Sequence, residues 1–438
     1  MKNKKLNIIR LSALLGILSL QIMSCKKDYS NPNAAIQEAV YSTTTPKGLT
    51  GVVVGLQRVY TLTRAGNEYN LITINGLTTN ELIVVNTGNT AEVQLAAGGT
   101  SVDGNHSMLT TYWTNLNKVI YDADLVIANA KNLADKNYAS GLTAYASIFK
   151  ALAIGSMSQF WEQVPAGIGT VANPVTFIPR VDGFKKAIAT LDDALAATSA
   201  NAISSAFLAN VPAGIDIINT LNALKARYSL YAELYPQALA AANLVDITKK
   251  STFNYDALSP NPIFDVATST NNVVQPKDST LGLPPSLAPS LSDGRVPFYT
   301  VINVTAPRFR INNFGNAATA AIPVYLPGEI TLIKAECYAR ANDSTTSKTF
   351  LNAVITKTAA ADPFGVGANQ PPINSYGSYA ALLEQIYRQR CIELFMSGQK
   401  LEDMRRFGRP IAERKRNLMP YPLRERDNNP NTPADPPF

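Results

Sequence analysis

Apolar residues recur at intervals of three and four positions through most of this 438-residue sequence. That interval places apolar side chains on one face of an α-helix, whereas a half-buried strand requires strict alternation. Clear stripes cover residues 142–156, 184–195, 221–235, 330–337 and 383–394. Because no series of alternating segments accompanies them, we predict a mostly α-helical fold whose few strands are short and confined to loops.

The predicted helices follow one another in pairs, over residues 121–161, 184–246 and 330–357. In the third pair, Ala335 and Ala353 resemble the small residues of tetratricopeptide helices, which let paired helices approach closely. The sequence therefore predicts a scaffold of tetratricopeptide-like helical pairs.

Two cysteines and two glycines add detail to the C-terminal helices. The helix over 383–394 should end at Gly398, because glycine readily adopts the left-handed conformation that closes a helix. A short helix from about residue 400 to 407 should follow, closed by Gly408. Cys337 and Cys391 both fall in helical patterns; a disulfide between them is open, and buried free thiols are the favoured interpretation.

Two long segments interrupt the helical pattern. Residues 75–106 are rich in Asn, Thr and Gly, and residues 259–328 carry seven prolines between Pro260 and Pro297. Long irregular segments in a compact protein commonly carry function or remain disordered. We expect these insertions in a single domain of residues 41–438 to form its ligand-binding side.

The N-terminus resembles a bacterial lipoprotein signal. Residues 1–24 combine a basic start with a thirteen-residue, mostly apolar run, which is too short for a membrane span of about 20 residues. Residues 22–25, Ile-Met-Ser-Cys, resemble a lipobox, in which the cysteine is acylated. This predicts lipid attachment at Cys25 and a polar tether over residues 25–40. The alternative is an ordinary signal peptide with an incidental cysteine.

The net charge of +7 does not indicate a nucleic-acid-binding protein. Four positive charges and no acidic residue lie within residues 1–24, and residues 384–427 hold 11 basic against 7 acidic residues. The remainder is close to neutral, so the sequence contains no basic stripe that could follow phosphates.

The motifs of common enzymes are also missing. His106 is the single histidine, which excludes zinc sites of the HExxH type and any site that needs two imidazoles. Neither a G-x-S-x-G nor a Walker A sequence occurs. Adjacent carboxylates such as Asp192 and Asp193 are best explained as solvated helix faces. We predict a binding protein without catalytic residues, metal or cofactor.

The C-terminal run 388–408 resembles the signature of the SusD/RagB family, R-x-x-E-L-x-x-E-G-x-R-x-x-D-L-x-R-x-G. Ser397 and Lys400 replace the usual Glu and Arg, and residues 421–431 resemble the family's closing phrase. The matching positions are Arg390, Glu393, Leu394, Gly398, Asp403, Arg406 and Gly408.

This resemblance implies an outer-membrane lipoprotein of the Bacteroidetes that faces the cell exterior. Such proteins lie as a lid on a SusC-like TonB-dependent transporter, capture glycans or, in some members, peptides, and pass them inward. The resemblance also implies that the motif residues are structural. We expect Glu393 and Asp403 to pair with Arg390 and Arg406 and so to lock the terminal helices.

Candidate ligand residues lie in the two irregular segments, because sugars bind by stacking on aromatic rings and by hydrogen bonds. They are Asn80, Glu81, Asp103, Asn105 and His106 in the first segment, and Phe298 and Tyr299 in the second. Packing of a loop against the body is the favoured alternative for each aromatic residue. Trp113 and Trp161 fall in predicted scaffold helices and should be core residues.

The sequence is also compatible with other ligands and other functions. No aromatic residue lies between Asn70 and Thr111, which weakens the case for a glycan and leaves peptides as candidates. Two further hypotheses are a helical-repeat surface scaffold that binds another protein without a small ligand, and a glycan- or peptide-cleaving enzyme that lacks a recognisable motif.

Overall fold

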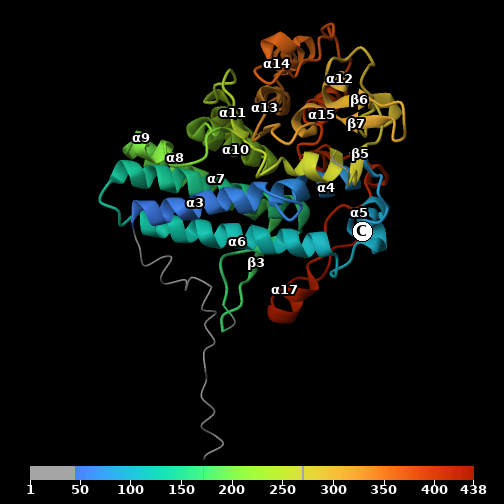
Figure 1. The fold of residues 1–438 in the computed structure, drawn as a ribbon. Helices are drawn as coiled ribbons and strands as arrows, with labels where there is room; N and C mark the ends of the chain where they lie inside the picture. The colour runs from blue at the N-terminus through green and yellow to red at the C-terminus, as the bar shows by residue number, and fades with distance from the viewer. Residues whose placement is uncertain (1–44, 171, 269–270) are drawn as a thin grey trace, which may run out of the picture. The chain divides into compact units, whose positions relative to one another are not determined.

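The computed structural model consists mainly of packed helices, as the apolar stripes predict (Figure 1). It describes residues 45–170, 172–268 and 271–438. The predicted signal peptide (1–24), the tether (25–40) and Cys25 lie outside these residues. No helix within the described ranges is long and apolar enough to cross a membrane.

Long helices from the first half of the chain form the scaffold. The central one is α7, which is buried along almost its whole length because α6, α8, α3 and α10 all pack against it. Its small residues allow close approach: a Cβ on Gly155 would lie 2.2 Å from the ring of Tyr228. The scaffold helices are α3 (Pro46–Thr61), α4 (Asn67–Thr78), α6 (Ser107–Ala130), α7 (Lys136–Phe160), α8 (Arg180–Ala200), α9 (Ser205–Leu208), α10 (Ile217–Tyr231) and α11 (Tyr235–Asn243).

The stripe over 221–235 is divided between two helices, which corrects the single helix expected there. The first helix, α10, ends at Tyr231, Glu233 adopts a left-handed φ of 58°, and α11 begins at Tyr235 with Pro236 in its first turn. Proline has no backbone N–H to donate, so it fits the start of a new helix and not the interior of a long one.

The C-terminal helices form a second group, which lies at the top of Figure 1. They are α13 (Pro327–Arg340), α14 (Ser344–Thr356), α15 (Tyr379–Glu393), α16 (Lys400–Arg406) and, apart from these, the short α17 (Leu423–Asn428). The pairing of α13 with α14 is confirmed. The end of α15 differs from expectation: the helix stops at Glu393, and turns through Met396 (φ 59°) carry the chain to Gly398 (φ 76°).

Within the described residues, the strands form four antiparallel two-stranded pairs. These are β1 (Leu82–Val84) with β5 (Val274–Pro276), β2 (Gln163–Pro165) with β3 (Phe177–Pro179), β4 (Thr252–Phe253) with β8 (Ile322–Pro323), and β6 (Thr300–Ile302) with β7 (Phe309–Ile311). Short helical turns occur at Gly99–Ser101, Phe264–Thr268, Pro285–Leu287, Asn313–Gly315, Ala359–Ala361 and Ile411–Glu413.

The two segments expected to be irregular differ from each other. The second, 259–328, holds short strands, turns and the five-residue helix α12 (Arg295–Tyr299) before α13 begins at its end. The first contains the end of α4 and a two-turn helix, α5 (Thr90–Ala97), which the sequence analysis did not expect. Its composition concealed the helix, because only Ala91, Glu92 and Leu95 of α5 are buried.

Both tryptophans belong to the core, as predicted. Trp113 and Trp161 are 3% and 0% exposed, and their rings meet edge to face with centroids 4.9 Å apart. Cys337 and Cys391 are buried free thiols, so the favoured alternative for these residues is confirmed.

Candidate functional site

The C-terminal motif forms a buried ion-pair network, and one predicted pairing within it is confirmed. Asp403 accepts from Arg390 at 2.8 Å and from Arg406 at 2.6 Å, and Arg406 also binds Glu336 of α13 at 2.7 Å. These side chains are all nearly inaccessible to solvent. The network therefore ties α15, α16 and α13 together.

Glu393 pairs with different partners from those expected. Its carboxylate accepts from Arg295 at 3.1 Å and from Lys357 at 2.6 Å, and it contacts neither Arg390 nor Arg406 in an ion pair. Arg295 is fully buried in the second irregular segment, and a buried guanidinium requires carboxylate partners. The motif glutamate meets that requirement together with Asp293, so it fastens the irregular segment to the helices.

Gly398 of the motif lets the turn after α15 approach α4. A Cβ on this glycine would lie 2.4 Å from Leu71 Cγ, and its φ of +76° favours glycine. Asn75 of α4 donates from Nδ2 to the Gly398 carbonyl oxygen over 2.8 Å. These contacts of the motif therefore stabilise the fold.

The two irregular segments lie side by side. Strand β1 of the first pairs with β5 of the second, with Ile83 opposite Gln275. Beyond the strands, Asn86 donates from Nδ2 to the Asn271 carbonyl oxygen over 3.2 Å. Segments nearly 200 positions apart thus lie side by side, near α5 in Figure 1.

The predicted ligand residues of the first segment do not converge. Glu81 is buried, and burial raises its pKa to about 7. Asn80 adopts a left-handed φ of 63° and donates to the Glu413 carbonyl oxygen. Asp103 and Asn105 are exposed, and Asp103 Oδ1 accepts from the Asn105 backbone N–H.

His106 caps the start of α6. Its Nδ1 accepts from the Leu109 N–H, so Nε2 carries the proton and donates to the Ala91 carbonyl oxygen over 2.9 Å. Burial lowers the pKa of this histidine below its ordinary value. With 2% of its surface exposed, the side chain joins α5 to α6 and is not accessible to a ligand in this structure.

Phe298 and Tyr299 belong to an aromatic cluster within the second segment. Their centroids are 5.0 Å apart, and Phe298 lies 5.3 Å from Phe314. The Tyr299 hydroxyl donates to the carbonyl oxygen of Glu393. These contacts hold α12 against the helices. They agree with the favoured alternative for the loop aromatics, in which each ring packs a loop against the body.

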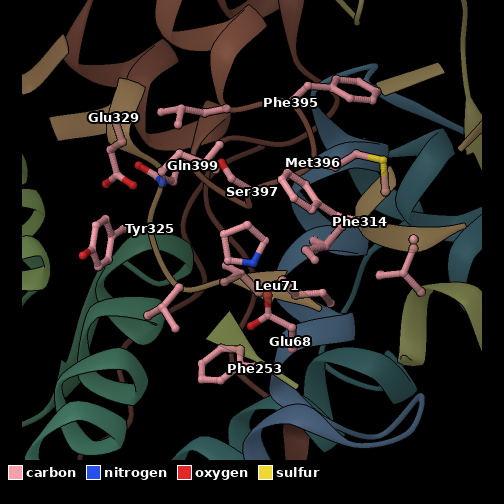
Figure 2. A pocket seen from close by; sticks show the side chains of 18 of the residues that line it. Glu68, Leu71, Phe253, Phe314, Tyr325, Glu329, Phe395, Met396, Ser397 and Gln399 are labelled. Atoms are coloured by element: carbon pink, nitrogen blue, oxygen red, sulfur yellow. The ribbon is translucent and has the colours of Figure 1, made fainter. Parts of the chain in front are cut away.

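A pocket of about 70 Å³ lies between the helical scaffold and the second segment (Figure 2). Tyr299 is the one predicted ligand residue in its lining. The Tyr325 hydroxyl and Ser397 Oγ are buried there without a hydrogen-bond partner in the described chain. Burial raises the pKa of Glu68 in the same wall to about 7. A pocket of this size can hold a few water molecules but is too small for most ligands, because ligand pockets measure about 300–1,000 Å³.

A larger, open hollow of about 500 Å³ borders the first segment. We call it the polar hollow; its lining is Arg64, Ala65, Asn70, Gly88, Asn89, Thr90, Ala91, Ser107, Met108 and Thr111. Arg64 donates to Asn89 Oδ1 over 2.9 Å and pairs with the buried Glu92. Asn70 Oδ1 is buried and accepts no hydrogen bond from any described residue.

The sequence indicated the segment that borders the polar hollow, but it did not indicate which residues line the hollow. The Asn- and Thr-rich composition pointed to Asn89 and Thr90 only as members of a long stretch. Arg64 and Asn70 precede that stretch, and only the packing of α4 against α5 brings them to it.

Comparison with known proteins agrees with the C-terminal motif. The model of the SusD family matches residues 309–435, which include the whole 388–408 run. The C-terminal part of the chain therefore matches the SusD family. No protein of curated function matches it in sequence.

Solved structures share the SusD fold along almost the entire chain. A SusD superfamily protein from Bacteroides fragilis has a TM-score of 0.67 at 16% identity, covering 89% of this chain and 99% of its own. A SusD-like carbohydrate-binding protein of the same species has a TM-score of 0.68 at 16% identity, covering 90% and 100%. B. fragilis NanU has a TM-score of 0.66 at 12% identity, covering 93% and 99%.

Proposed function

We propose that this protein is a SusD-family cell-surface lipoprotein that captures glycans or oligopeptides and delivers them to a SusC-like TonB-dependent transporter. The observation that carries the proposal is the family match over residues 309–435, joined to a fold shared with a SusD-like carbohydrate-binding protein over 90% of the chain. The lipobox-like sequence before Cys25 supports attachment to the outer membrane.

The polar hollow is the ligand site that we propose. Its volume of about 500 Å³ falls within the range of ligand pockets, and its walls offer the amides, hydroxyls and guanidinium that bind sugar hydroxyls or peptide groups. The hollow holds no aromatic platform, so an oligopeptide remains a candidate beside a glycan.

The proposed role is binding and not catalysis. Glu68 and Glu81 have perturbed pKa values but are buried away from the polar hollow. Among residues 45–170, 172–268 and 271–438, no three His, Cys, Asp or Glu side chains gather as they would around a metal ion. We propose a single domain over residues 41–438 that holds no catalytic residue.

Co-purification tests the transporter partnership. The tagged full-length lipoprotein, extracted from its native outer membrane in mild detergent, should carry a stoichiometric large barrel protein that mass spectrometry identifies. A protein that fractionates with membranes but emerges alone, with no barrel after crosslinking, would refute the lid role. That result would favour the alternative of a helical surface scaffold.

Blocking the polar hollow tests the ligand site. Thr111→Arg places a long side chain in the lining, whereas Thr114→Arg adds the same charge on an exposed position of α6 outside it. We expect at least a tenfold loss of affinity for whichever retained glycan or peptide is identified, in the first variant only. Equal affinities in both variants would move the ligand site elsewhere.

A further inference from the structure

A second groove lies among the C-terminal helices, far along the chain from the polar hollow. Its volume is about 380 Å³, and it runs between the turn from α13 to α14 and the loop that leads into α15. Leu382 is the buried apolar residue in its lining, while Asn342, Ser344, Asn374 and Ser375 are exposed on it. Figure 1 shows α14 well separated from α5, so the two hollows belong to different parts of the fold.

Two tyrosines line the groove. Tyr379, the first residue of α15, is 45% exposed, which is high for an aromatic side chain. The Tyr376 hydroxyl is buried and has no hydrogen-bond partner among the described residues. The exposed ring of Tyr379 therefore offers an apolar face on which a ligand can stack.

The walls of the groove are held in place by hydrogen bonds. Asn352 of α14 binds both backbone groups of Ile373, with its Nδ2 3.1 Å from the carbonyl oxygen and its Oδ1 2.9 Å from the N–H. Lys348 donates to the Asn374 carbonyl oxygen, and Ser378 Oγ caps α15 through the Ala381 N–H. Because these contacts fix the loop in advance, a ligand would lose little affinity to ordering it.

The chemistry of the groove selects the class of ligand. Lys348 is the one charged residue in the lining, and its ammonium already donates to the Asn374 carbonyl oxygen, so the groove favours a neutral ligand. The side chains of Asn342, Ser344, Asn374 and Ser375 add amide and hydroxyl groups that pair with neutral hydroxyls. We infer that this groove is a second saccharide site, in which a sugar ring stacks on Tyr379 and its hydroxyls bind the exposed amide and hydroxyl groups of the lining.

This inference rests on the proposed function for its ligand class, so the test separates the two. The full-length protein in detergent is titrated with malto-, cello-, xylo-, manno- and chitohexaose by calorimetry, alongside Tyr379→Ala, Tyr379→Phe and the polar-hollow variant Thr111→Arg. We expect a bound hexaose to lose at least about tenfold in affinity, or one of two sites, in Tyr379→Ala. Tyr379→Phe keeps the ring and should stay within about twofold of the wild type.

The other outcomes of the titration distinguish failure of the second site from failure of the proposed function. Binding that Tyr379→Ala leaves unchanged and Thr111→Arg abolishes would overturn the second site and leave the proposed function standing. Binding by none of the five hexaoses would overturn the groove as a saccharide site, while the barrel co-purification judges the transporter role independently. Asn374→Ala serves as a second groove variant, because its exposed side chain makes no described contact that folding requires.

Discussion

Replacing Glu393 by glutamine removes one negative charge from a buried network while keeping the shape of the side chain. Glu393 is fully buried and accepts from Arg295 over 3.1 Å and from Lys357 over 2.6 Å. Removing one partner from a buried ion pair costs about 3–5 kcal/mol. Asp293 and Asp362 remain beside the two cations, so we expect the lower end, about 3 kcal/mol of unfolding free energy.

Urea unfolding followed by tryptophan fluorescence measures this change, because both tryptophans are buried in the native state. The matched control is Asp182→Asn, which breaks an ion pair with Lys185 whose side chains are 47% and 52% exposed. Exposed pairs contribute less than about 1 kcal/mol, so this variant should unfold almost as the wild type does. A loss below about 1 kcal/mol in Glu393→Gln would refute the view that the motif glutamate locks the irregular segment.

Three further outcomes follow from the sequence and the structure. Glu68 keeps its proton up to a pKa of about 7 when folded but only to about 4.5 when unfolded, so stability should fall by about 3 kcal/mol as pH rises between these values. Glu68→Gln should remove that part of the slope in urea titrations at several pH values. Gly155→Ala should cost about 1–3 kcal/mol because its Cβ meets Tyr228, whereas Gly51→Ala, with open space around it, should be neutral or stabilising in thermal unfolding. Cys25→Ala should shift the protein from the membrane fraction to the soluble fraction on immunoblots, and retention in the membrane would contradict lipid anchoring.

The local sequence pattern was sufficient to predict a helix where that helix has one apolar face and a clear start. The stripe of α8 and the short helix α16 appear where their residues predict them, because side-chain spacing and capping act within a few positions. The break before α11 could have been predicted from Pro236. Helix α5 could not have been predicted, because only three of its residues are buried and the segment around them is polar.

The sequence by itself determined that this chain is helical, that Trp113 and Trp161 are core residues and, through the 388–408 run, which family its C-terminal part resembles. Only the tertiary structure decided which buried cation Glu393 neutralises and which residues line the polar hollow. The physical reason is the distance along the chain over which each kind of interaction acts. Helix formation and burial depend on spacings of three and four positions, whereas an ion pair or a pocket depends on segments that packing brings together from distant parts of the chain.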